Sequence, residues 1–549
     1  MVTGGLRGGA AQRSRSVPAT PPPVEPEALN GQERRQLTVV RRYGTLGALL
    51  LAVASLGAGA APVYNPVTGV PVLGLFARMP TVALACGFAG MAIIVISWLL
   101  LGRFARPGRE RLMSKSQMDR TLIMWATPLA LIPPLFSRDV YSYIAQGKIT
   151  ARGIDPYLLG AAQALGLADP LTRDIPNMWK ETPAPYGPLF LQCARWFSEI
   201  TSDSVVVSVL LHRGLELLGV AMIVWALPRL AKRFGAQPVS ALWLGAVNPL
   251  VLFHLIAGAH NEALMIGFMM AGLELALRHV PVTRPGEKPD KPPPWQRGEL
   301  LWLIIGAVVI TLGAAVKISA MPALGFLGVI VARRWGATFA HLVKAAAFMI
   351  AISATVLVTA SLVTGLGFGW TGQLGTPGLV RSWMAPVTGV GMLSGQLGVL
   401  LQLGNHTDAA IDVARLIGMA LAAAICVRLL WRSFRGRLDP MIGLGLALGV
   451  VVALGATVLP WYLLWAVIPL SAAVGDNRFR TVAAGVCAFI ALAQPPTGSG
   501  FLGHAFVLPQ AYLGAAVVVA LSLLVVNRTL PIRRRKAAQG DADRLSVRE

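Results

Sequence analysis

Charged residues are scarce in this 549-residue chain, and acidic residues are the scarcer kind. Only 13% of the residues are charged, with 25 Asp and Glu against 48 Lys and Arg, whereas 55% are hydrophobic. This balance excludes a string of soluble domains and indicates an integral membrane protein. The net charge of +23 would suggest nucleic-acid binding in a soluble chain. In a membrane protein, the same excess in short loops reports orientation instead.

Several signatures are also missing. The four cysteines are scattered without CxxC spacing, which argues against a disulfide framework or a metal site. No Walker, GxGxxG or HExxH motif is present, so ATP-driven transport and zinc proteolysis have no support. The first apolar run begins near Thr45, too far along the chain for the core of a secretory signal, and predicts a retained helix. We expect residues 1–44 to form a disordered cytoplasmic tail.

Apolar runs recur through residues 45–530. Because a bilayer core needs about 20 helical residues, these runs predict about 13 to 14 transmembrane helices. Three stretches, 239–278, 300–332 and 440–474, carry basic residues at both ends. A helix of about 33 residues would be roughly 50 Å long, too long for one crossing, so each stretch is predicted to be a hairpin. The expected fold class is an all-α polytopic bundle.

The basic residues divide unequally between the two sides that these spans define. About 35 of the 48 Lys and Arg residues lie on one side, which is therefore predicted to be cytoplasmic. Both termini, the basic tail 531–549 and the linker 279–299 belong to that side. We expect a multi-pass plasma-membrane protein with two longer outer segments, 137–204 and 366–410.

The first outer segment opens with Ser137-Arg138-Asp139-Val140-Tyr141-Ser142-Tyr143 and later contains Pro185-Tyr186-Gly187-Pro188. After Pro188, apolar residues recur at helical spacing with polar residues between them, and a weaker pattern follows Asp139. Such patterns predict amphipathic helices that lie in the membrane interface.

The predicted outer turns carry most of the remaining unusual residues, namely His260-Asn261-Glu262, Lys317 and Trp461-Tyr462, and the second outer segment adds Arg381. If these helix ends converge, they enclose a cavity suited to an anionic, sugar-bearing lipid. Each residue also has a plainer interpretation. A carboxylate favours a helix N-terminus, a lone lysine reaches the headgroups, and aromatic rings anchor span ends.

One charged pair is expected inside the membrane. Arg213 and Glu216 lie mid-span at i, i+3 and can neutralise each other on one helix face. A transporter would use such a pair in its pathway, so a fourteen-helix lipid or solute transporter is the main alternative from another class.

Five motifs in order resemble a known family: Ser137 to Tyr143, Gly153-Ile154-Asp155-Pro156-Tyr157, Pro185 to Pro188, Asn248-Pro249 and His260-Asn261-Glu262-Ala263. Over about residues 40–530 the chain resembles the actinobacterial polyprenol-phosphomannose-dependent α-1,6-mannosyltransferases of lipomannan synthesis, the MptA/MptB type, with a preference for MptB. The resemblance implies a GT-C fold, a lipid-linked mannosyl donor used on the outer face, and Asp139 as the catalytic base.

The expected reaction is an inverting mannosyl transfer from polyprenyl phosphomannose to a mannan or lipomannan glycolipid. In this hypothesis Lys317 and Arg381 neutralise the donor phosphate, Arg138 holds Asp139 ionised, and His260 and Glu262 position sugar hydroxyls. The other expected substrate-binding residues are Tyr141, Tyr186, Asn261, Trp461 and Tyr462. We expect no metal, no other cofactor and no nucleic acid. A different polyprenyl-linked sugar, such as arabinofuranose, stays open.

Overall fold

The computed structural model of the chain describes residues 26–202, 204–281, 294, 296–382, 384–501 and 505–529. The expected tail 531–549, most of the linker 279–299 and the first part of the 1–44 tail lie outside the described residues. Within them, the chain is almost entirely helical, and the only strands are the short parallel pair β1 (Glu27–Ala28) and β2 (Arg111–Leu112). The predicted all-α polytopic class is confirmed.

In the first half of the chain the helices are α1 (Gly31–Ala58), α2 (Leu73–Ala77), α3 (Pro80–Leu101), α4 (Lys115–Ala130), α5 (Asp139–Ala151), α6 (Ala161–Ala164), α7 (Pro170–Asp174), η1 (Asn177–Trp179), α8 (Pro188–Thr201), α9 (Val205–Phe234), α10 (Pro238–Gly245), η2 (Val251–Ala257) and α11 (Glu262–Leu277). In the second half they are α12 (Glu299–Val316), η3 (Ile318–Ala320), α13 (Pro322–Trp335), α14 (Phe339–Val363), η4 (Gly369–Leu379), α15 (Pro386–Leu400), α16 (Thr407–Phe434), α17 (Pro440–Ala453), η5 (Pro460–Tyr462), α18 (Leu463–Ala473), α19 (Asn477–Leu492) and α20 (Leu508–Thr529).

Helix α1 begins earlier than the sequence predicts. Its first residue is Gly31, because Asn30 and Glu33 form a reciprocal capping box that satisfies the free N–H groups of the first turn. Leu37 and Val40 are then buried in the bundle. The part of the predicted disordered tail from Gly31 onward is therefore ordered helix.

The number of long apolar helices is also smaller than expected. Within the described residues, eight helices are long and apolar enough to cross a membrane, or nine if a bent pair counts as one span. Several runs that the sequence suggests as spans form short helices: α10 has 8 residues, α17 has 14 and α18 has 11. At about 1.5 Å per residue, none of these reaches across a bilayer core alone.

The chain breaks at all three predicted hairpin turns. Helices η2 and α11 are bent by 108° at residues 258–261. Lys317 is extended, with φ −151° and ψ 125°, between α12 and η3. Helices α17 and α18 are separated by η5 and pack against each other.

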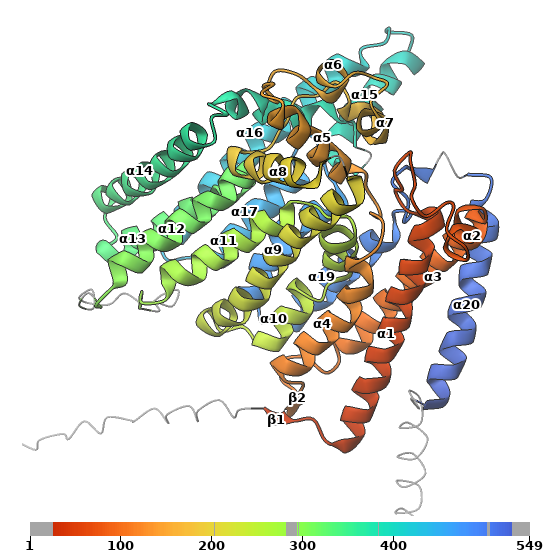
Figure 1. Cartoon of the computed structure of the whole chain (residues 1–549). Coiled ribbons are helices and arrows are strands. Elements are labelled where there is room, and N and C mark those ends of the chain that lie inside the picture. The colour runs from red at the N-terminus through yellow and green to blue at the C-terminus, as the bar shows by residue number, and fades with distance from the viewer. Residues whose placement is uncertain are drawn as a thin grey trace, which may run out of the picture.

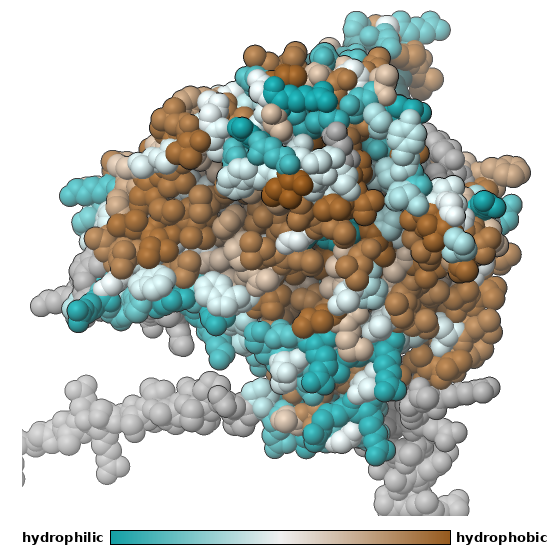
Figure 2. Space-filling view, viewed as in Figure 1, coloured by the Kyte–Doolittle hydropathy of each residue, from teal (hydrophilic) through white to brown (hydrophobic). Residues whose placement is uncertain are grey.

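Figure 1 shows α5, α6, α7 and α8 gathered at one end of the bundle, with β1, β2 and α10 towards the other. The two outer-segment patterns do form helices, α5 and α8, and these pack together. Between the two ends, Figure 2 shows a broad band of hydrophobic side chains with hydrophilic side chains on either side. Such a band is typical of a protein that lies across a bilayer.

Candidate active site

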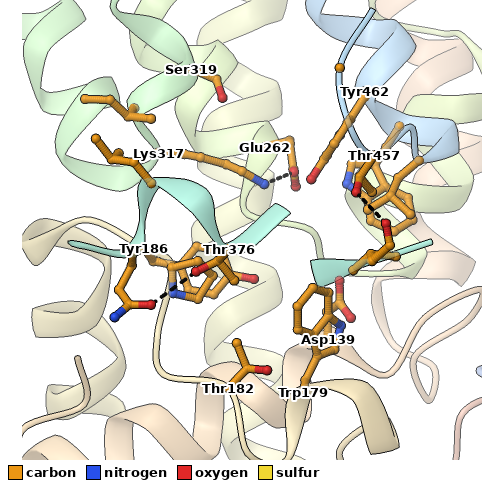
Figure 3. Close-up of a pocket in the computed structure, with 18 of the residues that line it drawn as sticks. Asp139, Trp179, Thr182, Tyr186, Glu262, Lys317, Ser319, Thr376, Thr457 and Tyr462 are labelled. Carbon is orange, nitrogen blue, oxygen red and sulfur yellow. Dashed lines mark hydrogen bonds and ion pairs between the residues drawn. The ribbon is translucent and has the colours of Figure 1, made fainter. Parts of the chain in front are cut away.

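The helix breaks and the N-terminus of α5 surround one cavity of about 250 Å³. Figure 3 shows side chains from several segments, far apart in the sequence, directed into it. The lining contains one cation, Lys317, and two carboxylates, Asp139 and Glu262. The predicted convergence of distant outer turns is therefore present in the fold. The other polar and aromatic lining residues include Ser142, Tyr143, Gln146, Trp179, Thr182, Tyr186, Ser319, Gln373, Thr376, Thr457, Trp461, Tyr462 and Trp465.

Asp139 is the first residue of α5, and its backbone N–H donates to the Ser137 hydroxyl at 3.0 Å. Its side chain is 16% exposed. Burial raises the pKa of the Asp139 carboxyl to about 6; the Ser137 hydroxyl opposes this rise, the Glu262 charge adds to it and the Lys317 charge opposes it. A carboxylate with a pKa in this range suits a general base near neutral pH.

Lys317 forms an ion pair with Glu262 (Figure 3). Glu262 is 1% exposed and Lys317 is 16% exposed, so the pair is largely removed from water. Aromatic rings surround the ammonium group, with Tyr462 at 5.0 Å, Trp465 at 5.7 Å and Tyr186 at 5.8 Å from their centroids. These distances are within the range of cation–π attraction. Lys317 is the only cation among the described lining residues, and these contacts hold it against the cavity wall.

His260 lies behind the wall rather than on it. Its side chain is fully buried and stacks on Trp461, with the ring centroids 3.6 Å apart. Its Nδ1 faces Asp139 Oδ2 at 3.5 Å and Glu262 Oε2 at 4.0 Å. His260 therefore lies beside Asp139 and outside the cavity lining, and its contact with sugar hydroxyls stays a prediction. Asn261 is also fully buried and absent from the cavity lining.

Arg138 and Tyr141 do not line the cavity. The Arg138 guanidinium donates to the Asp174 carbonyl at 2.7 Å and to the Ala61 carbonyl at 2.9 Å, and it pairs with the Asp174 carboxylate at 3.4 Å. Tyr141 is fully buried and donates to the Ala60 carbonyl at 2.5 Å. Residues that follow one another on a helix point in different directions. Arg138 therefore ties α5 to neighbouring loops, and its predicted effect on the ionisation of Asp139 stays a prediction.

Arg381 is also outside the cavity. It is 56% exposed and pairs with Asp408, which is 79% exposed, so the pair is at the surface. Its neighbour Val380 lines the cavity instead. The contact of Arg381 with a bound phosphate stays a prediction, and among the described lining residues Lys317 alone supplies positive charge to the wall.

Arg213 and Glu216 are not paired with each other. Arg213 donates to the backbone carbonyls of Ala130, Ile132, Ile256 and Ala257 at 2.6 to 3.1 Å. Glu216 accepts from the Leu264 N–H at 3.2 Å. Carbonyls at helix ends lack intrahelical partners, and the guanidinium satisfies four of them in the apolar interior. This structural role removes the specific support for a transport pathway through these residues.

Some lining residues escape sequence reasoning. Ser142 and Gln146 follow Asp139 on one face of α5, at i+3 and i+7, and the helical period could have identified them. Their side-chain oxygens are buried and have no hydrogen-bond partner among the described residues. Gln373 and Thr376 come from η4, and no sequence signal connects that segment to α5.

The fold and the site define a polytopic membrane protein whose helix ends enclose a carboxylate, an ion pair and several aromatic side chains. Residues 41–333 match the family model described as alpha-(1->6)-mannopyranosyltransferase, N-terminal domain, and residues 387–525 match the MptB C-terminal domain. No solved structure matches. The chain belongs to the alpha-(1->6)-mannopyranosyltransferase family.

Curated relatives cover nearly the whole chain. A probable alpha-(1->6)-mannopyranosyltransferase of Mycolicibacterium smegmatis is 44% identical over 512 residues, 92% of this chain and 91% of the relative. An alpha-(1->6)-mannopyranosyltransferase of Mycobacterium tuberculosis is 42% identical over 93% of this chain and 91% of its own length. Alpha-(1->6)-mannopyranosyltransferase B of Corynebacterium glutamicum is 37% identical over 91% of this chain and 83% of its own length.

Proposed function

We propose that the protein transfers mannose from polyprenyl phosphomannose to a hydroxyl of a mannan or lipomannan glycolipid, forming an α-1,6 link with inversion. The names of the relatives support the transferred sugar and the link. The observation that carries the proposal is the division of charge in the cavity. Lys317 offers a cation to a phosphate, while Asp139 lies in the same cavity with no ion-pair partner among the described residues except His260.

The donor phosphate binds at Lys317. A phosphodiester that leaves as a phosphate monoester develops negative charge, and a fixed cation stabilises that charge in the transition state. The Tyr186, Tyr462 and Trp465 rings hold the ammonium in place and shield it from water. Glu262 orients Lys317 through their ion pair and shares it with the bound phosphate.

Asp139 acts as the general base. The acceptor hydroxyl oxygen attacks C1 of the mannosyl group, its proton moves to the Asp139 carboxylate, and the bond between C1 and the phosphate oxygen breaks with its electron pair left on the phosphate. One base is enough for a direct displacement, which inverts the configuration at C1. Glu262 is held by Lys317 and is not available as a nucleophile. His260 keeps the Asp139 carboxylate oriented.

The proposed displacement uses no metal ion. Lys317 supplies the positive charge that a metal would otherwise bring to the phosphate. Within the described part of the chain, no three His, Cys, Asp or Glu side chains are grouped as metal ligands.

The proposed membrane side is the outer face, with both termini in the cytoplasm. Helix α9 starts near the cavity end, where α8 leads into it, and ends in Lys232 and Arg233 at the far end of the bundle. Helix α3 likewise leads away from the cavity end into the basic segment Arg103 to Arg111. An excess of Lys and Arg marks the cytoplasmic side, and this supports an outer cavity.

The test is transfer by the purified full-length protein in proteoliposomes. We expect label from polyprenyl phosphomannose to appear in a glycolipid acceptor, and linkage analysis to give an α-1,6 product. GDP-mannose and a polyprenyl phosphoarabinofuranose serve as matched donors and should give little product. Equal use of the nucleotide sugar would overturn the lipid-linked donor, and preferred use of the arabinosyl lipid would overturn the sugar.

A further inference from the structure

Arginine side chains gather at the end of the bundle opposite the cavity. Arg103 and Arg106 follow α3, and together with Asn477 at the start of α19 they line two adjoining hollows. Arg109 lines the first hollow and Arg480 lines the second. We call Arg103, Arg106 and Arg480, with Asn477, the arginine cluster.

The arginines of the cluster form no ion pair among the described residues, although Asp476 caps α19 next to Asn477. Arg109, beside it, is paired with Glu33 at 2.6 Å. Among the residues that the structure describes, no carboxylate lies within ion-pair distance of Arg103, Arg106 or Arg480. Arg106 instead lies close enough to repel the charge of Arg480. Like charges held together without a counterion favour the binding of an anion.

Arg480 is built into a rigid wall. It is 6% exposed, and its guanidinium lies 4.4 Å from the centroid of the Trp243 ring. Trp243 is itself fixed by two reciprocal hydrogen bonds. Its indole N–H donates to the Trp98 carbonyl at 2.8 Å, and the Trp98 indole N–H donates to the Trp243 carbonyl at 2.9 Å. Gly102 allows this packing, because a Cβ there would lie 2.5 Å from the Trp243 ring.

Donors in this wall are unused. Arg480 donates one weak bond to the Gly102 carbonyl at 3.4 Å, and its Nε–H is buried without a partner among the described residues. A buried donor left unpaired is unfavourable, and the Arg480 guanidinium, which lines the second hollow, keeps donors for an anion bound there.

The second hollow also has an apolar side. Leu99, which is 42% exposed, lines it together with Ala484 and Gly485. Leu99 belongs to α3, a helix long and apolar enough to cross the membrane. A basic mouth that continues into an apolar wall fits a phosphorylated headgroup with its acyl chain beside α3.

We propose that the arginine cluster is a binding site for a phosphate-bearing anion, on the side of the membrane opposite the active site. Arg480 and Arg106 hold the phosphate, Arg103 closes the mouth, and Leu99 contacts a lipid chain. Anionic phospholipids and soluble phosphates share the recognised group, and the apolar wall favours the lipid.

The test uses full-length protein and the exposed arginines, since Arg480 supports the fold. Native mass spectrometry counts phosphatidylglycerol bound by the unaltered protein, by Arg103→Gln/Arg106→Gln and by the control Arg478→Gln, an exposed arginine on α19 outside both hollows. We expect the double variant to bind at least tenfold more weakly and the control to bind normally. In a parallel arm, inorganic phosphate is titrated into lipid-free detergent solution while the melting temperature is followed.

Stabilisation by phosphate that is lost in the double variant, without selective lipid binding, supports the site with a soluble ligand. Loss of phosphatidylglycerol binding in the double variant but not in the control supports the site with a lipid ligand. The proposal would be overturned if the double variant bound both probes as well as the unaltered protein does. It would also be overturned if the Arg478→Gln control lost as much binding as the double variant.

Discussion

Substitutions in the buried ion pair between Lys317 and Glu262 separate its contribution to stability from its contribution to the transfer rate. Lys317→Met removes the cation and leaves the Glu262 carboxylate, 1% exposed, without its partner. Breaking a buried pair in this way destabilises a protein by about 3–5 kcal/mol. Removal of the charge that faces the leaving phosphate should also slow transfer by about 10²- to 10³-fold.

The double variant Lys317→Met/Glu262→Gln separates the two effects. It removes both charges, so most of the lost stability should return. The activity should stay low, because nothing replaces the ammonium beside the phosphate. Lys115→Met is the matched control, since it breaks an exposed pair with Asp119 and should change stability by about 0.5 kcal/mol or less.

The assays are thermal unfolding in detergent and initial rates with labelled polyprenyl phosphomannose. Recovery of both stability and activity in the double variant would refute the phosphate role and leave Lys317 a purely structural cation. An unchanged melting temperature in Lys317→Met would refute the claim that the pair is buried and coupled.

Three further predictions concern Asp139 and Arg381. Because burial raises the pKa of the Asp139 carboxyl to about 6, kcat/KM should rise about tenfold per pH unit below pH 6 and level above it; a rate profile flat from pH 4.5 to 8 would contradict a carboxylate base. The same raised pKa means that the stability contributed by the protonated carboxyl is full below about pH 4 and lost as the pH rises through 6, a loss that Asp139→Asn should remove in pH-dependent melting. Arg381→Gln breaks only an exposed pair, so donor KM and melting temperature should both stay within experimental scatter of the unaltered protein, and a several-fold rise in donor KM would return Arg381 to the site.

The sequence predicts the general architecture because helix formation and orientation in a membrane depend on hydropathy and on the distribution of basic residues, and both can be read locally. Apolar length predicts helices, and basic residues at both ends of a stretch predict a break, as at Lys317 between α12 and η3. The helix count fails because an apolar run carries no signal for where a helix ends. Helix η2 is a π-helix whose last carbonyls are capped by Arg213 from α9, and a local pattern does not reveal such a long-range contact.

The sequence predicts which turns form the candidate site, but not which side chains of those turns face the cavity. Lys317, Glu262 and Asp139 could be grouped because each lies at a break or a helix start. Whether a side chain then faces the cavity depends on its helix face and on competing partners. Arg138 pairs with Asp174, and Arg381 pairs with Asp408. Both carboxylates belong to other segments of the chain, so the local sequence does not reveal these pairs.

The most direct test of the central claim is the transfer rate of Asp139→Asn in proteoliposomes supplied with labelled polyprenyl phosphomannose. The substitution keeps the shape of the side chain and removes its basicity together with its negative charge. With expression and melting behaviour intact, the account predicts a fall of about 10²- to 10⁴-fold in kcat with donor KM little changed. Near-normal transfer by this variant would contradict the assignment of Asp139 as the base.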